Sequence, residues 1–279
     1  MPPMETWTTA DGLRLHLRHW PAERARGAVL LVHGLGEHVG RYDALARDIA
    51  AEGWAVWGYD QRGHGRSDGA RGAIAGADSL LHDLAGVIDL VRAGQQGRVA
   101  LLGHSMGGLI AARFVAEALA ARPAPWSRPV DALVLSSPAL DPGMNAVQRL
   151  LLALLGPLAP DLALGNGLKP DWVSRDPAVV RAYVDDPLVH DRVTPRLVRF
   201  IVDGGMRVRA QAARWHAPTL LMWAGADRCV APAGSAAFAA AAPPAVVQRQ
   251  AYPDLYHEIF NEPERAQPIG RLASFLRQI

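Results

Sequence analysis

A strand, a tight turn and a helix are predicted around one serine, and this stretch constrains the fold more than any other. Val99–Leu102 is apolar without alternation, as expected of a strand covered on both faces. Gly103 and Gly107 flank Ser105 in the pattern G-x-S-x-G, and the run Met106–Ala120 is rich in helix-forming Ala and Leu. Such a turn holds the serine hydroxyl out at the carboxyl edge of a sheet, where it is exposed as a nucleophile.

Short apolar strands alternate with helices along most of the chain, which favours a mostly parallel sheet with helices on both faces. Ligands bind such sheets beyond the carboxyl ends of the strands. Strands are predicted at 6–19 (an antiparallel hairpin), Ala28–Val32, Trp54–Tyr59, Val99–Leu102, Ala132–Ser136, Thr219–Ala224 and Ala245–Ala251. Helices are predicted at Arg41–Glu52, Ser79–Ala93, Met106–Ala120 and Glu264–Ile279.

Residues 138–215 break this alternation, and no strand-like run is found there. We expect a helical insertion over the sheet edge, which divides the chain into a core of residues 1–137 and 216–279 and a cap of residues 138–215. The alternative is that these helices are simply peripheral ones. The apolar run Leu150–Leu155 either lines a tunnel, touches a membrane surface or packs in the core.

Composition narrows the function classes. The 279 residues are 50% hydrophobic, enough for a large core, and the formal net charge is only +2. Lys169 is the only lysine and the arginines are scattered, so no nucleic-acid partner is expected. Cys229 is the only cysteine, so the chain forms no internal disulfide. Neither a signal peptide at Met1–Trp7 nor a membrane span is predicted, and we expect a cytoplasmic protein.

A serine nucleophile needs a base, and the base needs an orienting acid. Of the ten histidines, His257 lies in the loop between the last strand and the final helix, which brings it to the same sheet edge as Ser105. His104 precedes the serine and is expected to point elsewhere. Asp227 follows the Thr219–Ala224 strand directly, and it is the predicted acid. Glu258 is set aside because it is too close to His257 in sequence.

Two backbone amides are expected to face the substrate oxygen, one from Met106 and one from Leu35 in the loop after the Ala28–Val32 strand. Gly34 and Gly36 allow the backbone of that loop to approach closely. The polar stretch Asp60–Asp68 has no second cluster of His, Asp or Glu to complete a metal site, so a structural loop is predicted there. No metal and no cofactor are expected.

Five segments together resemble the monoacylglycerol lipase and lysophospholipase branch of the α/β-hydrolases. They are His33–His38, Asp60–Ser67, Gly103–Gly108, Ala226–Arg228 and Tyr256–Glu258, and Asp186–His190 also resembles a segment of that family's cap. The resemblance implies the α/β-hydrolase fold, with a mostly parallel eight-stranded sheet, helices on both faces and a helical cap. It also implies a triad of Ser105, Asp227 and His257, an oxyanion hole of Leu35 and Met106, and a cap that admits lipid-like acyl chains.

The sequence therefore predicts a serine ester hydrolase that cleaves monoacylglycerols or related lipid-like esters through an acyl-enzyme on Ser105. A small-ester or aminopeptidase-like hydrolase on the same triad is one alternative, and a non-catalytic binding protein of the same fold is another. The expected partner is a small acyl ester. The sequence leaves open a transient contact of the cap with a membrane or micelle, and it does not specify the oligomeric state.

Overall fold

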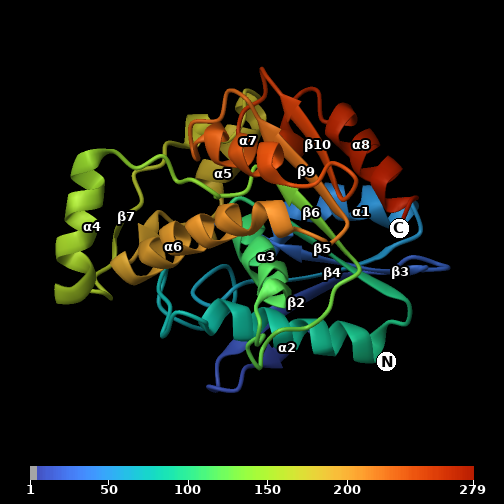
Figure 1. The fold of residues 1–279 in the computed structure, drawn as a ribbon, viewed down its shortest axis with the longest axis horizontal. Coiled ribbons are helices and arrows are strands. Elements are labelled where there is room, and N and C mark those ends of the chain that lie inside the picture. The colour runs from blue at the N-terminus through green and yellow to red at the C-terminus, as the bar shows by residue number, and fades with distance from the viewer. Residues whose placement is uncertain (1–4) are drawn as a thin grey trace.

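An eight-stranded sheet forms the centre of the molecule (Figure 1). The computed structural model describes residues 5–279, so residues 1–4 of the segment tested for a signal peptide lie outside it. The strand order is β1-β2-β4-β3-β5-β6-β9-β10. The strands are β1 (Thr6–Thr8), β2 (Arg14–Trp20), β3 (Gly27–Val32), β4 (Ala55–Tyr59), β5 (Arg98–His104), β6 (Ala132–Ser136), β9 (Thr219–Ala224) and β10 (Val247–Tyr252).

The sheet is antiparallel only at its amino-terminal edge, as predicted. Strand β2 pairs antiparallel with both β1 and β4, whereas the pairs from β4 through β10 are parallel. The hairpin strand β2 buries Leu15 and Leu17 and leaves the residues between and around them more exposed. The parallel strands β3, β4 and β6 are buried along their whole length, which explains why their sequences are apolar without alternation.

Helices cover both faces of the sheet (Figure 1). Alternate residues of each strand point to opposite faces, so Leu30 of β3 packs in one apolar cluster and Leu31 in the other. Helices α1 (Asp43–Ala51) and α8 (Ala266–Leu276) pack on one face. On the other face lie α2 (Ser79–Gly94), α3 (Met106–Ala116), α6 (Pro195–Gln211) and α7 (Pro232–Ala241).

The segment between β6 and β9 contains α4 (Ala146–Leu158), α5 (Pro177–Asp185) and α6, as well as two short strands that the sequence analysis did not predict. These strands, β7 (Leu164–Gly165) and β8 (Arg192–Val193), pair antiparallel. Helix α6 buries Leu197 and Phe200 in the cluster that holds α3, so this part of the segment belongs to the main core. Helix α4 lies at the edge of the molecule, away from the sheet (Figure 1).

Five short 3₁₀ helices complete the elements of residues 5–279 and lie mainly at helix ends and in loops. They are η1 (Val39–Tyr42), η2 (Glu117–Leu119), η3 (Pro170–Trp172), η4 (Ala212–Arg214) and η5 (Ile259–Asn261). Over the same range, no helix has both the length and the apolar character that a bilayer crossing requires.

Candidate active site

The backbone of Ser105 is held in a conformation that side chains rarely adopt. Strand β5 ends at His104 and α3 begins at Met106, so Ser105 forms the whole turn, with φ at +54° and ψ at −121°. A Cβ atom on Gly107 would lie 2.0 Å from the carbonyl oxygen of Val32, so only glycine fits at this position. Backbone strain of this kind costs about 1–3 kcal/mol and persists where the surrounding packing enforces it.

Two free backbone amides lie beside this turn. In the part of the chain that the structure describes, no hydrogen bond uses the N–H groups of Leu35 or Met106. The Leu35 loop touches the serine, since a Cβ atom built on Gly34 would lie 3.1 Å from Ser105 Cβ. The Met106 amide is at the first turn of α3, where helix geometry leaves N–H groups unpaired. Both donors are therefore available to an oxygen of a bound ligand.

His257 and Asp227 form a close hydrogen-bonded pair. His257 Nδ1 lies 2.7 Å from Asp227 Oδ2, and both side chains are almost completely buried. The other oxygen, Oδ1, accepts hydrogen bonds from the N–H groups of Cys229 at 2.8 Å and Val230 at 3.1 Å. Burial opposes the charge on His257, but the nearby carboxylates, Asp227 foremost and then Glu258 and Glu37, together raise the pKa of His257 above its usual value. Burial also opposes the charge on Asp227, and His257 and the two amides nevertheless lower the pKa of that carboxyl.

The His257–Asp227 pair contacts the serine turn through His104. The His104 and His257 rings are 4.6 Å apart between centroids, so His104 contacts the predicted base rather than pointing away from the site. Burial lowers the pKa of His104 to about 4, and it is neutral at pH 7. Within residues 5–279, no hydrogen bond joins the Ser105 hydroxyl to His257. Such bonds are often long in unliganded enzymes and tighten when substrate binds.

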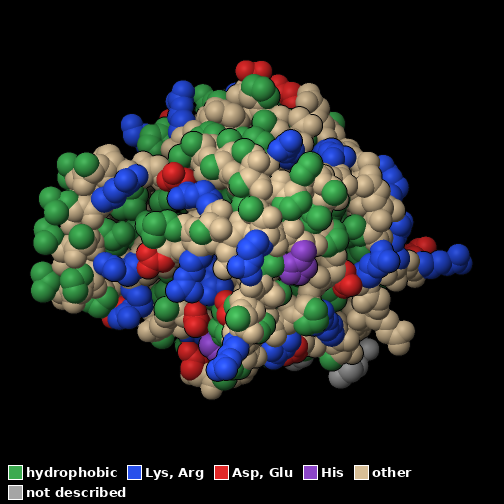
Figure 2. All heavy atoms as spheres, viewed as in Figure 1, with side chains coloured by type: hydrophobic (Ala, Val, Ile, Leu, Met, Phe, Trp, Pro, Cys, Tyr) green, Lys and Arg blue, Asp and Glu red, His purple; other side chains and the backbone are tan. Residues whose placement is uncertain are grey.

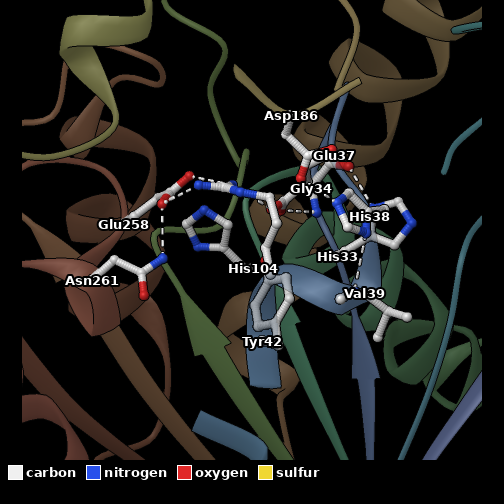
Figure 3. A network of polar contacts seen from close by, with 12 residues as sticks. His33, Gly34, Glu37, His38, Val39, Tyr42, His104, Asp186, Glu258 and Asn261 are labelled. Atoms are coloured by element: carbon white, nitrogen blue, oxygen red, sulfur yellow. Dashed lines mark hydrogen bonds and ion pairs between the residues drawn. The ribbon is translucent and has the colours of Figure 1, made fainter. Parts of the chain in front are cut away.

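A network of buried charges adjoins the site, and the sequence analysis did not predict it (Figure 3). Arg41 Nη1 lies 2.7 Å from Glu37 Oε2 and 2.6 Å from Glu258 Oε1. Glu37 Oε1 also accepts hydrogen bonds from Gly34 N at 2.6 Å and from Tyr42 Oη at 2.7 Å. Although burial opposes its charge, Arg41 lowers the pKa of Glu37 to about 2. Both Glu37 and Glu258 stand in motifs quoted above, but their joint contact with Arg41 depends on the tertiary fold.

The segment Asp186–His190 reaches the loop that carries Leu35. Asp186 Oδ2 lies 2.8 Å from His38 Nε2 (Figure 3), and the His190 N–H donates to the carbonyl of Gly36 at 2.8 Å. The insertion therefore contacts one of the two loops that frame the serine.

The polar loop that follows β4 is mostly satisfied by its own contacts. Asp60 accepts hydrogen bonds from the N–H groups of Val39 and Arg66, both at 2.8 Å. Among the described residues, two buried atoms of this loop, Gln61 Oε1 and His64 Nε2, have no partner. The loop is bound to the segment that carries Leu35, because Asp60 accepts from the Val39 N–H and Gln61 Nε2 donates to the carbonyl of His33 at 2.5 Å.

One group of possible metal ligands occurs in the described part of the chain, and it includes both members of the His257–Asp227 pair. Ligand atoms of Asp227, Cys229 and His257 lie within 4.8 Å of one another. Metals bind cysteine as the thiolate, and burial, with nearby negative charge, raises the pKa of the Cys229 thiol. The donor set therefore fits an acid–base pair beside a neutral thiol rather than a metal centre.

Known proteins resemble this chain over almost its whole length. A family model described as serine aminopeptidase, S33 matches residues 23–264. A monoacylglycerol lipase of Mycolicibacterium smegmatis is 35% identical over 95% of this chain and 93% of its own length. Phospholipase YtpA of Bacillus subtilis is 31% identical over 93% of this chain and 98% of its own length. The crystal structure of a monoacylglycerol lipase of Paleococcus ferrophilus superposes with a TM-score of 0.82 at 33% identity, covering 94% of this chain and 99% of that one.

Proposed function

This chain belongs to the serine aminopeptidase S33 family and has the α/β-hydrolase fold, and we propose that Ser105, His257 and Asp227 carry its chemistry. It is a carboxylic ester hydrolase that acts on monoacylglycerols. The observation that carries the proposed roles is the 2.7 Å bond between His257 and Asp227 beside a serine in a strained turn with two free amides.

In the proposed mechanism, Ser105 Oγ attacks the ester carbonyl while His257 Nε2 takes the hydroxyl proton. Asp227 holds the imidazole by Nδ1 and stabilises the imidazolium that forms. The carbonyl oxygen becomes an oxyanion, which the Leu35 and Met106 amides bind. Each such donor is worth roughly 3–4 kcal/mol in the transition state.

Collapse of the tetrahedral intermediate breaks the bond to the alcohol oxygen, and His257 gives its proton to that leaving group. The acyl group then remains on Ser105. A water molecule, deprotonated by His257, attacks the acyl carbonyl. The bond between the acyl carbon and Ser105 Oγ then breaks, Oγ takes the proton back from His257, and the fatty acid leaves. No cofactor enters these steps.

We also propose that residues 138–215 form a cap and that α4 contacts a lipid surface. This proposal is supported by the exposure of α4, in which no side chain is fully buried and only Leu152 and Leu155 of the run Leu150–Leu155 are half-buried. Its exposed hydrophobic residues lie at the edge of the molecule, where Figure 2 shows hydrophobic side chains gathered over α4. The exposed fractions are 65% for Val147, 60% for Leu150, 53% for Leu154 and 80% for Leu158. An apolar helix face of this kind is suited to binding the surface of a lipid layer. Such a layer holds the monoacylglycerol substrates of the enzyme.

The test is hydrolysis of a series of monoacylglycerols of rising chain length by wild type and Ser105→Ala. We expect the variant to lose turnover and labelling by a fluorophosphonate probe, while its circular dichroism spectrum stays unchanged. Wild-type turnover in Ser105→Ala would contradict the proposed mechanism. Lysophospholipids and amino-acyl amides in the same assay separate the phospholipase-like and aminopeptidase-like alternatives.

A further inference from the structure

Three charged side chains that the proposed mechanism does not use lie together in the core beside the site. We call Glu37, Arg41 and Glu258 the ion triplet. Arg41 contacts Glu258 twice, by Nη1 at 2.6 Å and by Nη2 at 2.8 Å, and it contacts Glu37 at 2.7 Å. None of the three side chains is more than 10% exposed. The ring of Tyr183, in α5 of the proposed cap, lies 4.7 Å from the Arg41 guanidinium carbon and shields it further from water.

Stability alone does not explain the ion triplet. Moving three charges out of water is costly, and apolar residues of similar volume often stabilise a core as well or better. The two carboxylates and one guanidinium also leave a net charge of −1 inside the protein. The ion triplet differs from an ordinary buried ion pair because its two carboxylates belong to the two loops that carry the predicted oxyanion donor and the predicted base.

One end of the ion triplet holds the loop that carries the predicted oxyanion donor Leu35. Glu37 Oε1 accepts the Gly34 N–H at 2.6 Å, and Gly34 is the residue directly before Leu35. Gly34 is also where this loop lies against the serine, since a Cβ atom built on it would lie 3.1 Å from Ser105 Cβ. Figure 3 shows Gly34 and Glu37 on one side of the network and Glu258 on the other, with His104 and Tyr42 between them.

The other end holds the loop of the predicted base. Glu258 directly follows His257, its N–H donates to the carbonyl of Val173 at 2.8 Å, and its Oε2 accepts from Asn261 Nδ2 at 2.8 Å. Glu258 is also bound twice to Arg41, so a movement of this loop away from Arg41 would have to break both of those bonds. The backbone positions that carry the base and the oxyanion donor are joined through one guanidinium.

We propose that the ion triplet is a positioning element of the reaction: it fixes the spacing between the Leu35 amide and His257, and its net negative charge stabilises the imidazolium of the transition state. The inference rests on the proposed function. In this proposal Glu37, Arg41 and Glu258 do not contact the substrate. They act through Leu35 and His257.

The electrostatic part of this proposal depends on every group that faces His257. The two carboxylates of the ion triplet raise the pKa of His257 after the larger effect of Asp227, and His104 is neutral at pH 7. The groups around the base are Asp227 and Cys229 from the loop after β9, His104 from β5, Glu258 from the base's own loop, and Glu37, Arg41 and Tyr42 from the loop and helix after β3.

The chain offers a matched control for the first test. Glu117 at the end of α3 is also bound to an arginine and a backbone amide, with Arg113 Nη1 at 2.6 Å and Ala124 N at 3.0 Å. We expect Glu37→Gln to lower kcat on a monomeric p-nitrophenyl ester by about tenfold or more, with KM changed less than about threefold, because only transition-state contacts are lost. Glu117→Gln should leave kcat unchanged. Urea unfolding of both variants shows that folded protein is being compared.

The second test is the pH profile of kcat/KM for Glu258→Gln. Removing one negative charge disfavours the imidazolium, so the acidic limb should move to lower pH by roughly one unit, with Glu117→Gln unmoved. Equal kcat in Glu37→Gln and Glu117→Gln, or an acidic limb that does not move in Glu258→Gln, overturns the inference. These outcomes are distinct from failure of the proposed function, in which Ser105→Ala itself keeps its turnover.

Discussion

Both oxygens of Asp227 are occupied, which fixes the charge and the orientation of this carboxylate. Oδ2 is bonded to His257 and Oδ1 to two backbone amides. Asp227 therefore stays ionised while it holds His257 in the tautomer whose Nε2 is free to accept a proton. The same contact makes a pH dependence predictable.

We predict that the acidic limb of kcat/KM lies above pH 6.5, the usual pKa of histidine, because the pKa of His257 is raised and only its neutral form is a base. Asp227→Asn should move the limb to lower pH and reduce kcat by about 10⁴, since the imidazole loses its charge partner and its tautomer. A pH–rate profile on a soluble ester measures both. A wild-type limb at or below pH 6.5, or one unmoved in Asp227→Asn, would count against His257 as the base.

The raised pKa of His257 also enters the stability of the fold. Its protonated form stabilises the folded state fully below its unfolded pKa, near 6.5, and that contribution is lost as the pH rises through the higher folded value. The effect on stability therefore runs opposite to the effect on activity, which needs the neutral imidazole.

At the residue scale, the sequence predicted the pairing of Asp227 with His257 because Asp227 follows the Thr219–Ala224 strand, His257 follows the last strand, and such strand ends meet at one edge. The same reasoning did not find the ion triplet. Glu258 was set aside as a partner for His257, and the structure indeed pairs it elsewhere, with Arg41 217 positions away. Nothing in local spacing indicates a contact over that distance.

At the scale of elements, alternation of short strands with helices predicted a mostly parallel sheet with helices on both faces, and the family resemblance implied its eight strands. Strands β7 and β8 were missed because two residues are too few to show any periodicity. Helix α3 ends at Ala116 and continues as the short helix η2, four residues before the end predicted from composition. Helix ends depend on caps and contacts that composition does not describe.

Helix α4 allows a test of the proposed lipid contact. We expect Leu150→Asp combined with Leu154→Asp to weaken binding to phosphatidylcholine vesicles and to raise KM for vesicle-bound monoacylglycerol by about tenfold or more. The reason is that each leucine contributes about 1.5–3 kcal/mol when it leaves water. Vesicle flotation and turnover of a soluble short-chain ester, which should not change, are the two measurements.

A single exposed hydrophobic residue outside α4 serves as the control for that experiment. Met206 on α6 is 50% exposed, and Met206→Asp should bind vesicles as wild type does. Equal vesicle binding by wild type and the α4 variant would show that α4 is not the contact surface.

At the scale of the whole molecule, the sheet separates two apolar clusters, and the proposed cap is not separate from them. Helix α6, inside residues 138–215, shares its cluster with α2, α3 and α7. The expected division into core and cap was set by position along the chain. The packing instead divides residues 138–215 into an outer part that contains α4 and an inner part that contains α6. Composition and the alternation with strands predicted the helices but not the partner against which each one packs.

This packing predicts one cooperative unfolding transition for the whole chain, measured by urea titration with far-ultraviolet and near-ultraviolet circular dichroism. Leu197→Ala, at a fully buried position of α6, should lower the free energy of unfolding by about 2–5 kcal/mol and shift both signals together. Leu150→Ala, at a position of α4 that is 60% exposed, should change it by less than about 0.5 kcal/mol. If Leu197→Ala instead splits the transition into two steps, residues 138–215 unfold independently and the insertion is a domain in its own right.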